Sequence, residues 1–438
     1  MRFFYFWTMI NTEYIYQLFK RSPEITTDSR NIKPGCLFFA LKGENFNGNK
    51  FAKDALNKGA IFAIIDEKQY HIPEKTILVK DTLKSLQKLA NLHRKKLGIP
   101  ILSITGTNGK TTTKELVSNV LAQKFNVSFT QGNLNNHIGV PLTLLSMNSE
   151  TEFGVVEMGA NHPGEIAALC SIADPDFGLI TNVGKAHLEG FGSFEGVKRT
   201  KAELYNFIKE KRGTIFLNTD NQNLKEMASG IQNKITYGKQ NADFTGEPVI
   251  SPPFVHVKAN FPKGVLYLNT NLIGDFNFEN VLAAACLGNY FGVDPLKIQS
   301  AIKAYQPHNI RSQLIQKNDL KIIMDAYNAN PTSMQASIKS FLSVMPKNNY
   351  LILGDMLELG EYTAEEHTNI LNLLKKYAVK GVFLVGNVFT EVAKNSEFQT
   401  FVNVDQLCNY LENHKIEKGN ILIKGSRGIR LEKVLNYI

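Results

Sequence analysis

The sequence predicts an α/β protein with three domains: a small mixed α/β domain, a central doubly wound parallel sheet and a Rossmann-like C-terminal domain. Its 438 residues are about three times the common domain length. From residue 101 onward, short apolar runs alternate with helical patterns, which is typical of parallel sheets. Pro100 follows Gly98 where this pattern begins, and such a pair marks a domain junction. The predicted domains are residues 1–98, 99–306 and 307–438.

The first domain is expected to contain two short strands and one long helix. Residues 36–41 and 60–65 are apolar runs that predict strands, and residues 82–98 carry the apolar spacing of a helix that ends at a glycine. The opening run, MRFFYFWTMI, is much shorter than the roughly 20 apolar residues that span a bilayer, and it lacks a cleavage site. We therefore expect no stable membrane insertion and a start at Met1 or Met9.

The other two domains are predicted from buried strand candidates that end in glycine or polar residues. The central candidates are residues 101–105, 154–159 and 176–184, followed by a β-rich stretch at 244–273 and a helical pattern at 276–292. The C-terminal candidates are residues 321–327, 349–356, 381–387 and 420–426. Ligands of such sheets bind at the carboxyl ends of the strands. The residues just after these runs are therefore the candidate site residues.

Charge and cysteine content exclude several classes of protein. Lys and Arg number 49 and Asp and Glu 40, a net charge of +9, but the basic residues are spread along the chain. The densest clusters, residues 94–96 and 209–212, are interpreted as solvated helix ends, so we expect no nucleic-acid partner. The four cysteines are Cys36, Cys170, Cys286 and Cys408. Their spacing fits neither a zinc site nor a disulfide framework, which indicates a cytoplasmic protein.

The most informative motif is a glycine-rich turn between a buried strand and a helix. It consists of Gly106, Thr107, Asn108, Gly109, Lys110, Thr111 and Thr112. Glycines let backbone N–H groups face phosphate oxygens, Lys110 supplies a cation for the β- and γ-phosphates, and Thr111 supplies a hydroxyl for Mg²⁺. Ile104 stands where the usual motif has its first glycine. The turn predicts nucleoside triphosphate binding and leaves a kinase, an ATPase motor and a ligase as alternatives.

The motif TGTNGKTTT resembles that of the Mur ligase family, ATP-dependent enzymes that add amino acids to the peptidoglycan precursor. Further family motifs follow in order over essentially the whole chain from residue 9. They occupy residues 26–30, 38–52, 132–145, 155–166, 181–193, 201–205, 277–285, 325–334, 353–360 and 424–432. GNLNN, EMGANHPGEI and LGDMLELG resemble the members that add D-alanyl-D-alanine.

The resemblance implies an ADP-forming amide ligase that adds D-alanyl-D-alanine to UDP-MurNAc-tripeptide through an acyl phosphate. This is the last cytoplasmic step toward the peptidoglycan pentapeptide precursor. The implied cofactors are ATP and Mg²⁺, the implied partners are the two substrates, and the expected state is a monomer. One alternative is a related ligase that adds the third stem-peptide residue or extends folylpolyglutamate. A P-loop ATPase without ligase activity is the other.

The family also implies two Mg²⁺ sites, whose ligands are Thr111, Glu157, His187 and a carbamylated Lys201. It implies that Lys110 and Arg311 are the cations that bind the phosphates. From the residues alone, each has a plainer interpretation. Glu157 ends a predicted strand and could accept bonds from backbone N–H groups, and a lone histidine such as His187 is more often structural. Without the resemblance, Lys201 is interpreted as a lysine on the surface of a helix. Lys198 lies one helical turn before it.

The remaining contacts are carried over from the family motif by motif. The nucleotide contacts are the phosphate turn, Asn277, Asn280, Arg311, Asp325 and Asn328, with Tyr327 and Asn330 as nucleotide or hinge contacts. The UDP contacts are Ser29, Arg30, Lys42 and Gly48; the muramoyl-peptide contacts are Asn135, Asn136 and His137; the D-alanyl-D-alanine carboxylate contacts are Lys424 and Arg427. Two departures stand out: Ile310 precedes Arg311 where many relatives carry glycine, and Ala326 replaces a second acid.

Overall fold

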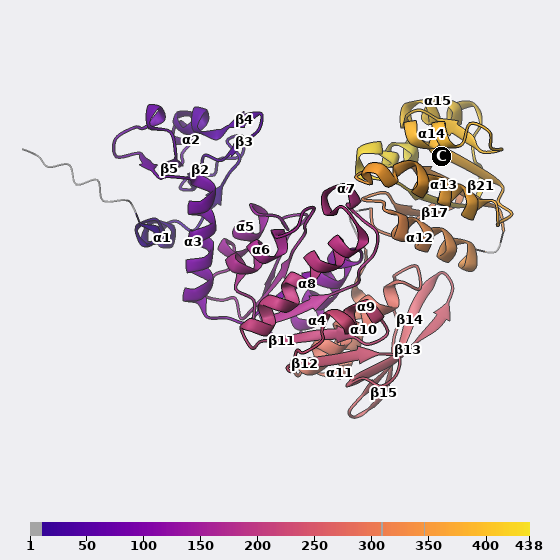
Figure 1. The fold of residues 1–438 in the computed structure, drawn as a ribbon, viewed down its shortest axis with the longest axis horizontal. Helices are drawn as coiled ribbons and strands as arrows, with labels where there is room; N and C mark the ends of the chain where they lie inside the picture. Colours follow the sequence, from indigo (N-terminus) through magenta and orange to yellow (C-terminus); the bar gives the residue numbers. More distant parts are fainter. Residues whose placement is uncertain (1–10, 308–309, 346) are drawn as a thin grey trace, which may run out of the picture.

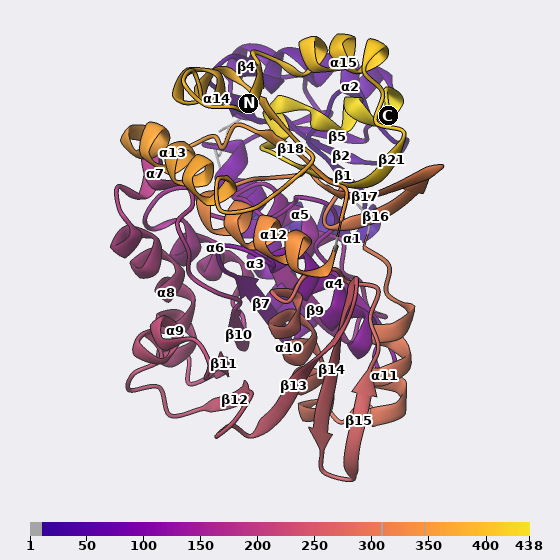
Figure 2. The same cartoon turned by 90° about the vertical axis from the view of Figure 1, so that its right-hand side faces the viewer.

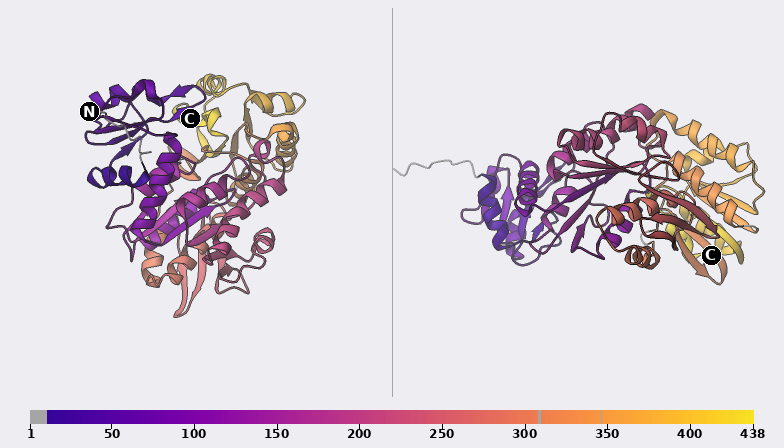
Figure 3. Two further views of the ribbon diagram at one scale, coloured as in Figure 1. Left: turned by 60° about the vertical axis from the view of Figure 1, so that its left-hand side comes forward. Right: turned by 90° about the horizontal axis from the view of Figure 1, so that it is seen from below.

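The computed structural model describes residues 11–307, 310–345 and 347–438. It arranges them as three α/β domains (Figure 1), which lie in a row in the view from below (Figure 3). The predicted fold class is therefore confirmed. Within these ranges no helix is both long enough and apolar enough to cross a membrane. The run MRFFYFWTMI lies outside the described residues.

In its described part, residues 11–98, the N-terminal domain has a four-stranded parallel sheet, an additional hairpin and three α-helices. The strand order is β1-β2-β5-β6, and the predicted strands and helix are present as β2, β5 and α3. The elements are α1 (Thr12–Arg21), β1 (Ile25–Thr26), β2 (Leu37–Phe39), β3 (Lys42–Gly43), β4 (Phe46–Asn47), α2 (Ala52–Asn57), β5 (Phe62–Ile65), β6 (Thr76–Leu78) and α3 (Thr82–Leu97).

Helix α3 joins the N-terminal domain to the central domain. The Asp81 side chain caps its start by accepting a bond from the Lys84 N–H at 2.8 Å, and Gly98 ends it at φ +66°. Arg94 is only 5% exposed and donates to Asp176 Oδ2 at 2.7 Å. The interpretation of this cluster as a solvated helix end was wrong for Arg94, because the central domain covers that end of the helix.

The central domain contains a nine-stranded sheet in the order β15-β14-β13-β12-β11-β10-β7-β9-β8. All neighbours are parallel except the antiparallel β13-β14-β15 segment. Its strands are β7 (Ile101–Thr105), β8 (Val127–Phe129), β9 (Phe153–Glu157), β10 (Phe177–Ile180), β11 (Thr214–Asn218), β12 (Lys234–Gly238), β13 (Phe244–Ser251), β14 (Phe254–Phe261) and β15 (Gly264–Leu268). Its helices are α4 (Lys110–Leu121), α5 (Gly139–Leu145), α6 (Glu165–Ala173), α7 (Leu188–Phe191), α8 (Phe194–Glu210), α9 (Gln222–Met227), α10 (Asn277–Tyr290) and α11 (Pro295–Ala304).

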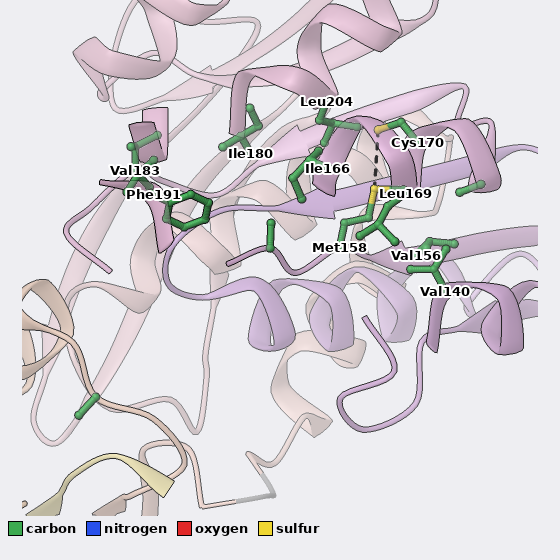
Figure 4. Packing of buried hydrophobic residues seen from close by; sticks show 14 of the residues in the cluster. Val140, Val156, Met158, Ile166, Leu169, Cys170, Ile180, Val183, Phe191 and Leu204 are labelled. Carbon is green, nitrogen blue, oxygen red and sulfur yellow. Dashed lines mark hydrogen bonds between the residues drawn. The ribbon is translucent and has the colours of Figure 1, made fainter. Parts of the chain in front are cut away.

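Helices cover both faces of this sheet. Helices α4, α10 and α11 share one apolar cluster with one face, and α5, α6 and α8 belong to the cluster on the other. Figure 4 shows Ile166 and Leu169 of α6 near Leu204 of α8 and Ile180 of β10. Strand β7 lies between β9 and β10. Such a strand is a topological switch point, where a ligand crevice forms at the carboxyl end.

The C-terminal domain contains a six-stranded sheet in the order β16-β17-β21-β18-β19-β20, parallel except for the edge strand β16. The four predicted strands are β17, β18, β19 and β21. The elements are β16 (Gln313–Lys317), β17 (Asp319–Asp325), α12 (Pro331–Val344), β18 (Asn349–Gly354), α13 (Thr363–Leu374), β19 (Gly381–Val385), α14 (Asn387–Val392), β20 (Gln399–Phe401), α15 (Val404–Asn413) and β21 (Lys418–Lys424).

The central and C-terminal domains meet near the carboxyl ends of their sheets. Glu157 is the last residue of β9, Asp325 of β17 and Lys424 of β21. Helix α7 of the central domain lies beside the C-terminal domain in both perpendicular views (Figures 1 and 2). Polar strand ends from two domains therefore face a common space.

Candidate active site

A cavity of about 810 Å³ lies between the central and C-terminal domains. Most of the predicted nucleotide, metal and peptide contacts line it. They are Thr107, Asn108, Gly109, Lys110, Thr111, Thr112, Asn135, Asn136, His137, Glu157, His187, Asn277, Asn280, Arg311, Asp325, Asn328 and Lys424. Sequence motifs that are far apart along the chain therefore contribute to one space.

The phosphate turn has a shape that requires its glycines. Gly106 and Gly109 have φ values of +143° and +77°. A Cβ on Gly106 would lie 2.0 Å from Thr181 Oγ1, and one on Gly109 would lie 2.6 Å from Asn280 Oδ1. Since these backbones have room for no side chain, their N–H groups can approach an anion closely. Ile104 causes no conflict, because it is a fully buried residue within β7.

Lys110 begins helix α4 and folds back over the turn. Its Nζ donates to the carbonyl of Gly106 at 2.8 Å and to that of Thr107 at 3.0 Å. Burial lowers the pKa of Lys110 to about 8, while the nearby Glu157 carboxylate opposes this shift and Arg311 adds to it. Lys110 is thus a cation that the protein desolvates in the absence of an anion, and a phosphate group would compensate for that cost.

Asn277 and Asn280 brace the same turn from helix α10. Asn280 Oδ1 accepts a bond from Thr113 Oγ1 at 3.0 Å, and its amide nitrogen donates to Asn277 Oδ1 at 2.9 Å. Asn277 in turn donates to the carbonyl of Ile273 at 2.8 Å. The pair shares one helix face, as their spacing predicted, and both side chains are buried.

Only one of the two carboxylate oxygens of Glu157 has a hydrogen-bond partner. Oε1 accepts a bond from Asn135 Nδ2 at 2.8 Å, whereas Oε2 is buried without a hydrogen-bond partner. A buried carboxylate oxygen is costly unless a cation or donor meets it. Glu157 and Thr111 line one cavity, and Mg²⁺ commonly binds one or two carboxylates together with phosphate oxygens. These residues therefore fit a magnesium site, although no group of three or more His, Cys, Asp or Glu residues forms a metal cluster within the described ranges.

His187 connects the two domains. It has a left-handed backbone, φ +49°, at the start of α7, and its Nδ1 lies against the carboxylate of Glu358 in the C-terminal domain. That contact lowers the pKa of Glu358. Glu358 was not among the predicted site residues, although it lies within the LGDMLELG motif that identified the family.

Lys201 lies inside the protein, and its interpretation as a surface lysine is wrong. It is 2% exposed, and its Nζ lies 5.5 Å from the centre of the Phe191 ring. Burial, followed by the nearby Lys110 cation, lowers the pKa of Lys201 to about 7. The signal for its burial is the helical spacing of apolar residues on the same face, which are Val197, Leu204 and Ile208.

Lys198 points away from this region. Its Nζ pairs with Glu226 of helix α9 at a distance of 2.5 Å. The two lysines of α8 therefore have different partners, although a spacing of three residues separates them by only about 60° around the helix.

Arg311 and Asp325 form the C-terminal side of the cavity. The Arg311 guanidinium lies 3.8 Å from the centre of the Tyr327 ring, and its buried Nε has no hydrogen-bond partner. Asp325 Oδ2 accepts a bond from Lys424 Nζ at 2.6 Å. Ile310 adopts φ +60°, a region that favours glycine, at the position where relatives carry that residue.

The predicted UDP contacts lie on the N-terminal domain, outside the cavity. Ser29 is buried, the Arg30 guanidinium pairs with Asp28, and Lys42 Nζ lies 3.1 Å from Asp66. A Cβ on Gly48 would lie 2.5 Å from the carbonyl oxygen of Leu41, so this position requires glycine. Arg427 also lies outside the cavity, and its half-exposed guanidinium pairs with Glu432 at 3.1 Å.

Comparisons with known proteins agree with this arrangement. Residues 23–102 match the model described as Mur ligase family, catalytic domain; residues 104–288 match Mur ligase middle domain; residues 310–427 match Mur ligase, glutamate ligase domain. A relative from Bacillus subtilis (strain 168), named UDP-N-acetylmuramoyl-tripeptide–D-alanyl-D-alanine ligase, is 35% identical over 94% of this chain and 92% of its own length. This chain belongs to the Mur ligase family.

A further relative and two solved structures are also similar to this Mur ligase. A protein of that name from Escherichia coli (strain K12) is 34% identical over 94% of this chain and 93% of its own. A crystal structure of MurF from Acinetobacter baumannii superimposes with a TM-score of 0.86 at 29% identity, covering 96% of this chain and 97% of its own. MurF ligase from Thermotoga maritima in complex with ADP gives 0.83 at 28% identity, covering 95% and 97%.

Two of these Mur ligase contacts were not anticipated from the sequence. Glu358 is one, and Asn182 is the other, because its Oδ1 accepts a bond from the N–H of Asn108 in the phosphate turn at 3.0 Å. Asn182 follows strand β10, in the TNVGKAHLEGFGS motif. Its position at the polar end of the predicted strand 176–184 was the available signal, since such residues meet at the edge of the sheet.

Proposed function

We propose that this Mur ligase joins D-alanyl-D-alanine to the terminal carboxylate of UDP-MurNAc-tripeptide, with conversion of ATP to ADP and phosphate. The observation that carries the proposal is the single cavity that combines a preformed phosphate turn, the half-satisfied Glu157 and the C-terminal Arg311. The identity of the substrates follows from the relatives of that name, which match over 94% of the chain.

The chemistry explains why cations and carboxylates share the site. A carboxylate is a poor electrophile, so its oxygen first takes the γ-phosphoryl group, and the dipeptide amine then attacks the acyl phosphate. Lys110 and Arg311 neutralise the charge that develops on the transferred group, and the phosphate turn orients it. Thr111 and Glu157 would hold Mg²⁺, which supplies further charge neutralisation.

The second metal site is proposed to contain His187 and carbamylated Lys201. Mg²⁺ prefers oxygen ligands, and carbamylation would convert the Lys201 amine into such a ligand. Only the neutral amine reacts with CO₂, and a pKa of about 7 leaves a large neutral fraction at physiological pH. The low exposure of Lys201 supports the proposal, because burial disfavours the charged ammonium form.

The remaining substrate contacts are proposed as the family motifs suggest. Ser29, Arg30, Lys42 and Gly48 would bind the UDP group, and Asn135, Asn136 and His137 the muramoyl-peptide. Lys424 and Arg427 would bind the D-alanyl-D-alanine carboxylate. Lys424 is already paired with Asp325 and Arg427 with Glu432, so each would have to share its charge with an acid. We further propose a monomer that works in the cytoplasm.

Substrate dependence tests the proposed function directly. Phosphate release from ATP should require UDP-MurNAc-tripeptide and D-alanyl-D-alanine together, because the acyl phosphate forms on one and is consumed by the other. The measurement is phosphate release with each substrate omitted in turn, and with glutamate or diaminopimelate in place of the dipeptide. Equal activity with either amino acid would favour the related ligases, and ATP hydrolysis independent of any acceptor would favour a P-loop ATPase.

Domain closure is a second prediction. Asn330 Nδ2 donates to Asn108 Oδ1 at 2.8 Å, and Lys185 Nζ lies 2.6 Å from Glu366 Oε1, so polar contacts already link the two domains beside the cavity. We expect a hinge near residues 306–311, of which 308 and 309 lie outside the described residues, to bring these domains closer around bound substrates. Small-angle scattering should show a smaller radius of gyration with an ATP analogue and UDP-MurNAc-tripeptide together. An unchanged radius at saturation would contradict closure.

A further inference from the structure

Helix α6 begins at a glycine, and the carboxylate that caps it comes from another helix. Gly164 is the N-cap residue, at φ +84°, and it has no side chain to accept a bond. Glu203 of helix α8 takes that role: Oε1 accepts from the N–H of Gly164 at 2.7 Å and Oε2 from the N–H of Ala167 at 2.8 Å. The first N–H groups of a helix lack partners within it, and a carboxylate at this end is also favoured by the helix dipole.

Glu203 and Lys201 extend from the same helix in different directions. Residues two apart differ by about 200° around a helix, so Glu203 meets α6 while Lys201 Nζ lies beside the Phe191 ring of α7. The apolar contacts between α6 and α8, near Ile166 and Leu204 (Figure 4), are non-directional. The two bonds from Glu203 add a directional contact between the helices.

The segment from Met158 to Gly164 ends at the same contact, and Glu165 Oε2 also holds it by accepting a bond from the N–H of Asn161 at 2.7 Å. It leaves β9 directly after Glu157, and the N–H of Gly159 donates to the carbonyl of Asn135 at 2.8 Å. A Cβ on Gly190 would lie 2.1 Å from the carbonyl oxygen of Asn161, so the segment runs directly against α7. Gly159 and Asn161 line the cavity. Gly164 is the last residue of this segment, and its N–H donates to Glu203.

We propose that Glu203 is a positioning residue of the ligase reaction, which clamps α8 to the start of α6 and so keeps Lys201 and residues 158–164 in place beside the cavity. Glu203 itself touches no reacting group. This inference rests on the proposed function, in which Lys201 supplies a metal ligand. A displacement of a reacting or ligating group by about 1 Å can cost on the order of 10²-fold in rate.

Hydrogen exchange tests the clamp without any use of activity. In the full-length protein, Glu203→Ala should raise the amide exchange rates of Gly164 and Ala167 at least tenfold, because both N–H groups lose their acceptor. Glu203→Gln keeps one acceptor oxygen and should give an intermediate rate, and it carries the test if the alanine variant does not fold. Glu210→Gln, at an exposed position of the same helix, should leave both rates unchanged. Unchanged exchange in the Glu203 variants would overturn the clamp.

A double-mutant cycle tests whether the clamp acts through Lys201. Glu203→Ala should lower kcat on the order of 10- to 100-fold and leave KM for ATP within about twofold, since the phosphate turn does not touch Glu203. Added to Lys201→Ala, the same change should cost nothing further. Losses that multiply, or a wild-type kcat, would overturn the positioning role. Full activity of Lys201→Ala would overturn it together with the metal role of Lys201, whereas the exchange rates would still report the clamp separately.

Discussion

Replacing Lys110 by alanine should lower kcat on the order of 10³-fold, equivalent to about 4 kcal/mol of transition-state stabilisation. Lys110 Nζ lies over the phosphate turn, hydrogen-bonded to the carbonyls of Gly106 and Thr107. The variant therefore removes a cation at the position where the transferred phosphoryl group carries most charge. Steady-state kinetics with saturating substrates give the measurement.

The control for Lys110→Ala is Lys209→Ala, an exposed lysine of the same domain that lies outside the cavity. It should retain wild-type kcat, because it removes the same charge from the chain without touching the phosphate site. Circular dichroism should show that both variants are folded. A folded Lys110→Ala variant with near-normal kcat would remove the phosphate turn from the mechanism.

Lys201→Ala should be nearly inactive, with a loss on the order of 10²- to 10³-fold. The variant lacks the proposed metal ligand, which is the carbamate oxygen of Lys201. A small carboxylate can enter the space left by the side chain and supply an oxygen ligand in its place. Formate or acetate should therefore restore part of the rate of Lys201→Ala and leave the wild-type rate unchanged. In wild type, removal of CO₂ and bicarbonate should lower activity most at low pH, where more of the Lys201 amine is protonated.

Lys198→Ala is the matched control on the same helix. Lys198 pairs with the half-exposed Glu226, and ion pairs that solvent reaches contribute little to stability, so this variant should behave like wild type. Full activity of Lys201→Ala together with inactive Lys198→Ala would move the metal role one helical turn toward the start of α8. Failure of formate and acetate to restore any rate would count against an oxygen ligand at this position.

Site features that depend only on residues close together in the sequence were predictable. Glu157 and Asp325 end apolar runs, and a parallel sheet places such ends at its ligand-binding edge. The phosphate turn was predictable because only glycine tolerates its backbone angles and close contacts at residues 106 and 109. Asn277 and Asn280 needed only the helical spacing of three residues to be placed on one face.

Features that depend on contacts between distant segments were not predictable in this way. Arg94 belongs to a basic cluster at a helix end, and such clusters are usually solvated. It is buried because the central domain covers that end of the helix. Glu358 meets His187 only after the C-terminal domain docks. Lys201 is an intermediate case, since the apolar spacing around it marks a buried face, but an isolated lysine on that face contradicts the usual preference for exposure.

The most direct test of the proposed ligase reaction follows the oxygen that the carboxylate gives up. UDP-MurNAc-tripeptide labelled with ¹⁸O in its terminal carboxylate should be incubated with ATP, Mg²⁺, D-alanyl-D-alanine and the enzyme, and the released phosphate analysed by mass spectrometry. Transfer through an acyl phosphate predicts one ¹⁸O atom in each phosphate, and a pentapeptide product that retains the other. Phosphate free of ¹⁸O, with the tripeptide unchanged, would contradict the reaction.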